Sequence, residues 1–170
     1  MGKILIAIST LLMICIAAGC NTSGCTENQS SVPLAEFYAS ETGDVISLTN
    51  VEIGGVGAPH DSLLSNGRSA ISQIYLPFRS TKQTTSFYFH YKQEGIDSTI
   101  YNDTITFDYT SQPTFVSEEC GAMFFYKITK LENTTHLIDS VVIIDSLITN
   151  TDIKRLGIYF KTDSGEGDTE

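Results

Sequence analysis

The sequence predicts an all-β protein, an antiparallel β-sandwich of about eight strands with immunoglobulin-like or jelly-roll connections. Apolar and polar residues alternate strictly in several segments, as they do in a strand with one buried face. Gly-rich stretches such as GGVGAPHD and SNGRSA lie between them and supply turns. No segment shows a convincing helical period. A closed barrel satisfies the same pattern.

The first strands are expected before residue 92. In VISLTNVEI the apolar phase slips at Asn50, which predicts a bulge or turn there. ISQIYLPF contains Pro77, which cannot donate to a ladder and predicts an edge or a strand end. TSFYFHY, from Thr85, places Phe87, Phe89 and Tyr91 on one face, and we expect that face to be buried.

Four more strands are expected towards the C-terminus. DTITFDY, from Asp103, and RLGIYFK, from Arg155, alternate with period two and predict half-buried strands. AMFFYKI, from Ala122, and VVII, from Val141, are apolar on both faces. We expect these two to be central strands, because both faces of a central strand are covered.

The N-terminus is predicted to be a signal peptide. Lys3 precedes an almost wholly apolar run over residues 4–18, which is too short and too weakly flanked for a good membrane span. Ala17-Ala18-Gly19 then precede Cys20. This arrangement resembles the bacterial lipobox, although Ala17 stands where Leu is commoner. The resemblance implies cleavage after residue 19 and acylation of Cys20. Two or more acyl chains give stable anchoring. An ordinary cleaved signal, with Cys20 a free thiol, is the alternative.

The rest of the chain reads as one domain between two polar ends. Cleavage would leave 151 residues with a net charge of −11, enough for one core. We expect a lipidated linker over residues 20–33, the β-sandwich over 34–162, and a disordered acidic tail over 163–170. The acidic balance argues against nucleic acid and anionic lipid as partners.

Two cysteines remain in the predicted mature chain, Cys25 and Cys120. An exported protein meets an oxidising compartment, so we expect a disulfide between them. Two unpaired thiols are the alternative. Neither cysteine has a Cys or His at ligand spacing, so we expect no metal site.

The sequence offers weak candidates for catalysis. His60, His90 and His136 lie in no catalytic or metal-binding pattern, and surface positions are their ordinary role. Glu118 and Glu119 are paired carboxylates that a hydrolase could use, but they are contiguous, in a predicted turn, without an orienting histidine. We therefore expect no enzyme activity and no cofactor, with a hydrolase as the remotest alternative.

A glycan-binding module is a more serious alternative. Sugar sites stack aromatic rings, and four tyrosines are expected to face outward: Tyr75, Tyr88, Tyr101 and Tyr159. The chain contains no Trp, and exposed Tyr on strands is common in cross-strand pairs.

A short pattern recurs through the chain. Five of the ten Asp residues are followed by Ser or Thr and then by Leu, Ile, Val or Thr, where composition alone gives about one. The pattern resembles the O-glycosylation motif of exported Bacteroidetes proteins. The implied acceptors are Ser62, Ser98, Thr104, Ser140 and Ser146. A turn Asp before a strand produces the same pattern.

Together these features resemble a family of uncharacterised Bacteroidetes outer-membrane lipoproteins. The likeness rests on Cys20, CTEN from Cys25, DSLLSN from Asp61, LPF from Leu76 and FVSEECG from Phe115. It implies a lipidated all-β domain and supplies no catalytic residues. Such lipoproteins, when exported to the cell surface, usually carry an acidic cluster behind the lipidated cysteine. Here only Glu27 is near, which favours the periplasmic face of the outer membrane.

From these features we expect a non-enzymatic, lipid-anchored envelope protein. Its expected role is that of an accessory or docking subunit of an outer-membrane assembly, with an envelope protein as partner. Strand addition at an exposed sheet edge is one way to dock.

Overall fold

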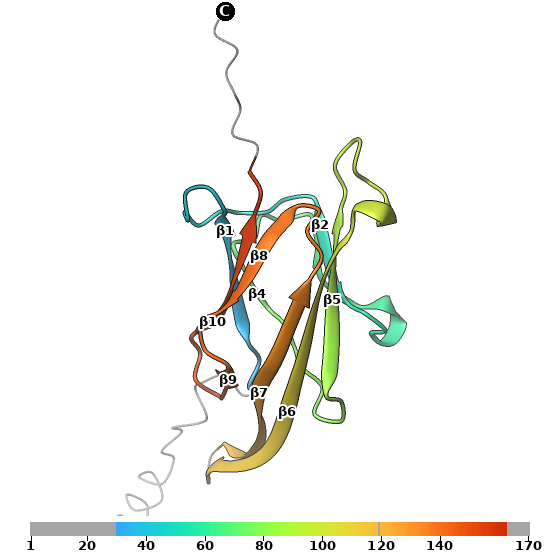
Figure 1. Cartoon of the computed structure of the whole chain (residues 1–170). Coiled ribbons are helices and arrows are strands. Elements are labelled where there is room, and N and C mark those ends of the chain that lie inside the picture. The colour runs from blue at the N-terminus through green and yellow to red at the C-terminus, as the bar shows by residue number, and fades with distance from the viewer. Residues whose placement is uncertain (1–29, 119, 163–170) are drawn as a thin grey trace, which may run out of the picture.

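The computed structural model describes residues 30–118 and 120–162. Within them the chain is an all-β sandwich of two sheets (Figure 1), as the sequence predicts. It has ten strands where about eight were expected. The excess comes from two short strands of four and two residues, Leu63–Asn66 and Leu147–Ile148.

The first sheet has four strands in the order β4-β1-β10-β8. Their bounds are Gln73–Tyr75, Leu34–Ala39, Lys154–Phe160 and Ile138–Ile143. β1 and β10 pair in parallel, whereas β1 with β4 and β10 with β8 are antiparallel. The first and last strands of the domain are therefore neighbours at the centre of this sheet.

The second sheet has six strands in the order β3-β2-β5-β6-β7-β9, all antiparallel. Their bounds are Leu63–Asn66, Val51–Gly55, Thr84–Tyr91, Asp103–Ser117, Gly121–Asn133 and Leu147–Ile148. Two 3-10 turns, η1 (Pro59–Asp61) and η2 (Thr99–Tyr101), connect strands of this sheet. Asn50 adopts a φ of 55° immediately before β2, so the predicted turn is confirmed.

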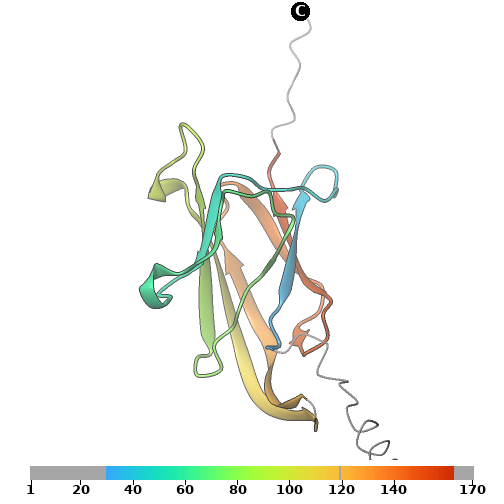
Figure 2. The same cartoon turned by 180° about the vertical axis from the view of Figure 1, so that it is seen from behind.

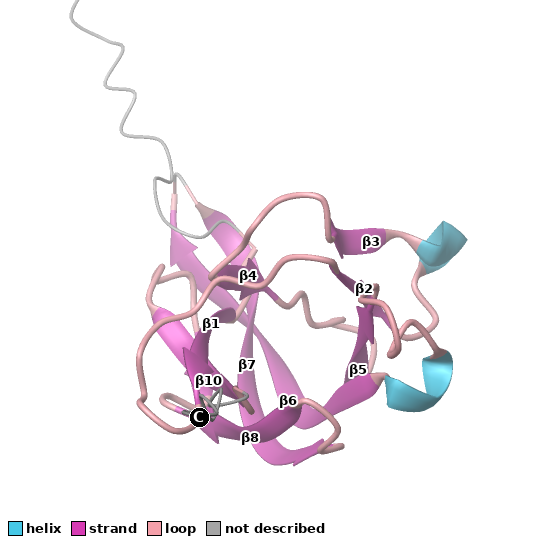
Figure 3. Cartoon of the chain, turned by 90° about the horizontal axis from the view of Figure 1, so that it is seen from above, coloured by secondary structure: helices cyan, strands magenta, loops and turns pink. Residues whose placement is uncertain are grey.

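The core lies between the two sheets, which curve around it when seen from above (Figure 3). The predicted alternation is confirmed in three strands. Buried side chains are Phe87, Phe89 and Tyr91 in β5, Ile105, Phe107 and Tyr109 in β6, and Leu156, Ile158 and Phe160 in β10. Aromatic edge contacts join the sheets; the rings of Phe37 and Phe89, for example, lie 6.5 Å apart at 75°, a favourable geometry.

The prediction for VVII was wrong. This segment lies in β8, at one edge of the four-stranded sheet, and not in its centre. Its apolar content correctly indicated a strand, but apolar residues on both faces do not by themselves prove that both faces are covered. AMFFYKI forms most of β7, which lies between β6 and β9. Because β9 pairs only with Tyr126 and Lys127, the first part of β7 has β6 as its one strand partner among the described residues.

The chain enters and leaves the sandwich at opposite ends. Figures 1 and 2 show β1 beginning at the end where the long β6–β7 hairpin projects, and β10 ending at the other. The loop that carries η2 lies at the same end as the C-terminus of β10 (Figure 1).

Candidate functional site

The β8 edge, defined here as Val141 to Ile143 of β8 with the following Ile144, is the most apolar edge among the four outermost strands of the two sheets in the described part of the fold. Its register pairs Val141 with Ile158, Val142 with Gly157 and Ile143 with Leu156. Val141 and Ile143 therefore face the core, yet both are only half-buried. Val142 and Ile144, on the outer face, are 46% and 56% exposed. Four consecutive apolar residues thus line a strand edge whose one pairing partner, within the described residues, is β10.

The other three sheet edges are better protected against pairing. β9 has two residues and β4 has three, and short edge strands pair poorly with other chains. β3 has four residues and a bulge, because Leu64 has no partner in its register with β2. Bulges twist an edge away from regular pairing. Of the four outermost strands, β8 is therefore the one best suited to accept another strand.

Two hollows flank the bulged edge at β3. One, of about 540 Å³, lies between β3 and the segment that follows it, and Leu64 and Ile71 line it. The other, of about 250 Å³, lies between Leu64, Phe78 and Phe87, with Arg79 also in its lining. Two of the motifs quoted above, DSLLSN and LPF, are thus brought together at the smaller hollow.

The outer face of the four-stranded sheet carries a compact polar network around Glu36 on β1. The Glu36 carboxylate accepts hydrogen bonds from Lys154 Nζ at 2.7 Å, from the Tyr38 hydroxyl, and from Gln73 Nε2 at 2.7 Å. These bonds, that from Lys154 first, lower the pKa of Glu36 from 4.5 to about 2 against the opposing effect of burial. Sequence reasoning missed this network, because its members lie on three strands far apart in the chain.

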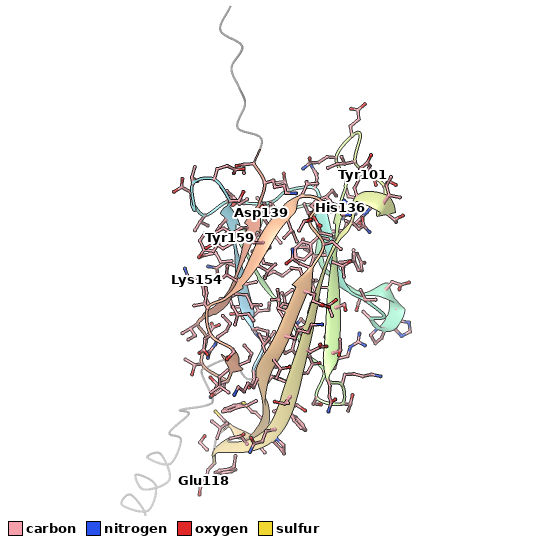
Figure 4. The ribbon with its side chains drawn as sticks, in the orientation of Figure 1. Tyr101, Glu118, His136, Asp139, Lys154 and Tyr159 are labelled. Carbon is pink, nitrogen blue, oxygen red and sulfur yellow. The ribbon has the colours of Figure 1, made fainter. Side chains whose placement is uncertain are left out.

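The four tyrosines expected to face outward do not form one site. Tyr75 and Tyr159 lie on the four-stranded sheet, Tyr88 lies on the six-stranded sheet, and Tyr101 lies in η2 at one end (Figure 4). Tyr159 stacks on Tyr38 with ring centroids 5.1 Å apart. Tyr75 is 44% exposed and donates a hydrogen bond to Asp152 at 2.7 Å.

The three histidines are dispersed. His60 is exposed in η1, and His136 is exposed just before β8. His90 has more partners: its Nδ1 lies 2.6 Å from Asn102 Oδ1, and its Nε2 lies 3.1 Å from Asp97. Lys92 lies 3.4 Å from the same Asp97 oxygen. This cluster ties the loop after β5 to the sheet and contains no aligned nucleophile.

Asp103 is the first residue of β6, as predicted, but its buried contacts were not indicated by the sequence pattern. Its carboxylate is fully buried and accepts bonds of 2.8 Å from the N–H groups of His136, Leu137 and Ile138. Tyr91 and Thr134 donate to it as well, at 2.7 and 2.8 Å. Burial raises the pKa of Asp103, but these bonds outweigh it and hold the pKa below the ordinary 3.8. Asp103 therefore fixes the turn that leads into β8.

The predicted cysteine and glutamate sites lie at one end of the molecule or outside the described residues. Cys20, Cys25 and Glu119 lie outside them. Cys120 is half-buried in the turn of the β6–β7 hairpin, where its N–H donates to Ser117 Oγ at 3.1 Å. Glu118 is exposed in the same turn (Figure 4), away from the hollows beside β3.

The predicted glycosylation acceptors are spread over both sheets. Ser62 is exposed between η1 and β3. The other four are half-buried: Ser98 before η2, Thr104 on β6, Ser140 on β8 and Ser146 between β8 and β9. Within residues 30–118 and 120–162, no group of three His, Cys, Asp or Glu side chains can hold a metal ion. No helix in this part of the chain is long and apolar enough to cross a membrane.

Fold and surface define, over the described residues, a β-sandwich protein with an apolar edge at β8. The chain belongs to a family of unknown function, DUF6452, whose model matches residues 50–160. The matched region runs from the turn before β2 to the end of β10 and contains the β8 edge. No match to the chain was found among curated proteins or solved structures.

Proposed function

We propose that this protein is a non-enzymatic, lipid-anchored subunit of the bacterial cell envelope that docks on an outer-membrane assembly. The lipobox-like residues before Cys20 support an anchor of two or more acyl chains. The absence of an acidic cluster behind Cys20 supports the periplasmic face. The likeness to Bacteroidetes lipoproteins agrees with this placement.

The observation that carries the docking function is the mismatch between β8 and its position. VVII has the composition of a strand that is covered on both faces, yet it lies at an edge with Val142 and Ile144 exposed. Unpaired N–H and C=O groups on such an edge are a template for another strand. The partner that fits is an extended segment of an envelope protein with apolar side chains, added beside β8.

Photocrosslinking from β8 tests this docking mode. Two variants are made, one with benzoylphenylalanine at position 142 and one with it at position 144. In living cells, both should crosslink to the same segment of one envelope protein. Because strand residues two apart share a face, the two labelled partner residues should also lie two apart. The same probe at Val56, which is 52% exposed in the loop after β2, is the matched control. Labelling that scatters over many proteins, or that is equal from Val56, would contradict docking at β8.

A second change places a charge on the edge. Val142→Lys and Ile144→Lys each put a lysine at an exposed position of the β8 edge, a device that natural edges use against pairing. Either variant should lose the partner in a mild-detergent pull-down while keeping the native melting temperature within a few degrees, about the effect of a surface change. Retention of a stoichiometric partner by both variants would exclude the β8 edge.

Glycan binding is the second candidate, favoured by one specific observation. Tyr38, Tyr75 and Tyr159 lie on the outer face of the four-stranded sheet, beside the polar network of Glu36, Gln73 and Lys154. A polar and aromatic face of this kind suits sugar rings. A glycan array with the native protein and with Tyr75→Ala decides between the candidates. Binding to a defined glycan that Tyr75→Ala abolishes would favour this module over docking.

The hydrolase alternative receives no such support. Glu118 is exposed at the hairpin turn, and an acid–base residue needs a substrate pocket and an orienting partner. The disulfide between Cys25 and Cys120 and the five O-glycans form part of our proposal, and each has its own test in the Discussion.

A further inference from the structure

The outer half of the β6–β7 hairpin is a two-stranded ribbon. β5 pairs with β6 only over residues 103–108, and β9 pairs with β7 only at Tyr126 and Lys127. Beyond these points, residues 111–117 of β6 pair with residues 121–126 of β7. From residue 125 outward to the hairpin turn, neither strand has another strand partner among the described residues. An isolated two-stranded ribbon is marginally stable in water, so a further contact on one of its faces would stabilise this half of the hairpin.

One face of the ribbon continues the core. Tyr109 and Tyr126 are buried, and their rings are 5.5 Å apart. Counting outward in steps of two from these residues leads to Phe115 on β6 and Phe124 on β7, so both belong to the same face. The register confirms it, because Pro113 pairs with Phe124 and Ser111 with Tyr126. This face, carrying Phe115 and Phe124, is called here the ribbon face.

The ribbon face is open where the core ends. Phe115 is 69% exposed and Phe124 is 42% exposed. Figure 1 shows the hairpin projecting past the start of β1 and past β9, so the four-stranded sheet does not cover it. The segment that precedes the described chain, NTSGCTENQ, contains no large apolar side chain. Its side chains therefore offer little apolar area for contact with two phenylalanine rings.

The position of the anchor points to lipid as the cover. β1 begins at the end from which the hairpin projects (Figures 1 and 2). Nine residues lie between Cys20 and Ser30, and the ten Cα–Cα steps across them span at most about 35 Å. The ribbon is roughly 24 Å long for its seven residues on β6, at about 3.4 Å per residue. An acylated Cys20, which is part of the function proposed above, therefore keeps the hairpin tip within reach of the bilayer.

We infer that the ribbon face inserts Phe115 and Phe124 into the membrane surface that holds the acyl chains of Cys20. Exposed aromatic residues partition shallowly, about 5–10 Å into the boundary between headgroups and acyl chains. Glu118 at the tip and the chain's net charge of −10 oppose anionic headgroups. The surface that fits is one rich in phosphatidylethanolamine, whose amine can pair with the carboxylate. The acylated Cys20 and the ribbon face then both hold the sandwich at the membrane. Two attachment points fix the orientation of the β8 edge relative to the membrane.

The chain contains no Trp, so a single introduced Trp reports its own surroundings. Phe115→Trp is the test variant. Ile100→Trp is the matched control, because Ile100 is 68% exposed, about as much as Phe115. Ile100 lies in η2, beside Tyr101, which Figure 4 shows at the opposite end of the molecule. Each full-length lipoprotein is purified and reconstituted in vesicles of phosphatidylethanolamine with a minor share of phosphatidylglycerol. The vesicles contain lipids brominated either near the headgroup or near the chain end.

We expect the Trp emission of the Phe115→Trp protein to shift to shorter wavelength and to be quenched most by bromine near the headgroup. The emission of the Ile100→Trp control should show neither the shift nor the quenching. Phe115→Trp with Phe124→Asp should lose most of the quenching without loss of folding, since Phe124 is partly exposed. Unquenched emission from Phe115→Trp would overturn the inference. A blue shift without quenching would also overturn it, in favour of a protein cover. The mass of the Cys20 peptide separates the two proposals: if it carries no acyl group, both fail, and if it is acylated but Trp is unquenched, only this one fails.

Discussion

The hydroxyl of Tyr91 donates a 2.7 Å hydrogen bond to the carboxylate of Asp103, and both side chains are buried. Tyr91 belongs to β5, and the N–H groups that also bind Asp103 belong to the turn before β8 and to Ile138, its first residue. One carboxylate therefore joins the six-stranded sheet to the strand that we propose as the docking edge.

Asp103→Asn should destabilise the fold strongly. The amide replaces one acceptor oxygen with a donor that faces buried N–H groups, which leaves donors without partners. We expect a loss of about 2–4 kcal/mol in the free energy of unfolding, measured by urea denaturation. Asp139→Asn, at an exposed position on β8, should cost under about 0.5 kcal/mol. Equal effects of the two changes would contradict the structural role of Asp103.

Glu36 should make stability depend on pH in the acid range. Its folded pKa of about 2 lies below the ordinary 4.5, so the folded state favours the carboxylate. The stabilisation is therefore complete above pH 4.5 and is lost as the pH falls through about 2. Glu36→Gln should remove this part of the acid sensitivity and leave the part due to Asp103. Unfolding curves of the two proteins at several pH values from 5 downward test this, and parallel pH profiles would contradict it.

Gly54 should not tolerate a side chain while Tyr88 is present. A Cβ at position 54 would lie 2.6 Å from the Tyr88 hydroxyl oxygen and 2.7 Å from Cζ, so the ring must move. We expect Gly54→Ala to cost about 1–3 kcal/mol. Because the two residues are in contact, Gly54→Ala combined with Tyr88→Ala should cost less than the sum of the single changes. Strict additivity in thermal unfolding would show that the ring does not oppose the new methyl group.

Reduction should lower the melting temperature if Cys25 and Cys120 are bridged. The bridge would close a loop of nearly a hundred residues, for which chain entropy gives roughly 4–5 kcal/mol. Calorimetry with and without a reductant measures the change, and Cys25→Ser should match the reduced protein. Two free thiols in the native protein would exclude the bridge.

Cys20→Ala should release the protein from membranes if Cys20 carries the anchor.

Glycan occupancy should follow exposure if the Asp-Ser/Thr motifs are used. Ser62 is exposed in a loop, whereas Thr104 is half-buried within β6 and its N–H is bonded to Thr134. We expect full occupancy at Ser62 and the lowest at Thr104, measured by peptide mass spectrometry of protein from its native host. Ser62→Ala should then remove one glycan from the intact mass. A native protein with the unmodified mass at all five positions would exclude the motif.

Local patterns predicted the strands well because period-two alternation is a local property. Phe87, Phe89 and Tyr91 are buried as expected, and the turn at Asn50 lies where the apolar phase slips. Sheet order is not local, so VVII was placed in a sheet centre although β8 lies at an edge. The Glu36 network and the Asp103 contacts depend on strands that are far apart in sequence. Asp103 also shares its local pattern with four exposed or half-buried motifs, which hides its structural role.

The parallel pair of β1 and β10 has a consequence for the order in which the protein can fold. β1 has two strand partners, β4 and β10, and the second arrives more than a hundred residues later in the chain. Contacts this distant in sequence are slow to form, because the whole intervening loop must close first. If the chain is exported from its N-terminus, as we propose, the four-stranded sheet can be completed only after residues 154–160 have crossed the membrane. The lipidation site would leave the translocation channel long before the domain it tethers has a finished core.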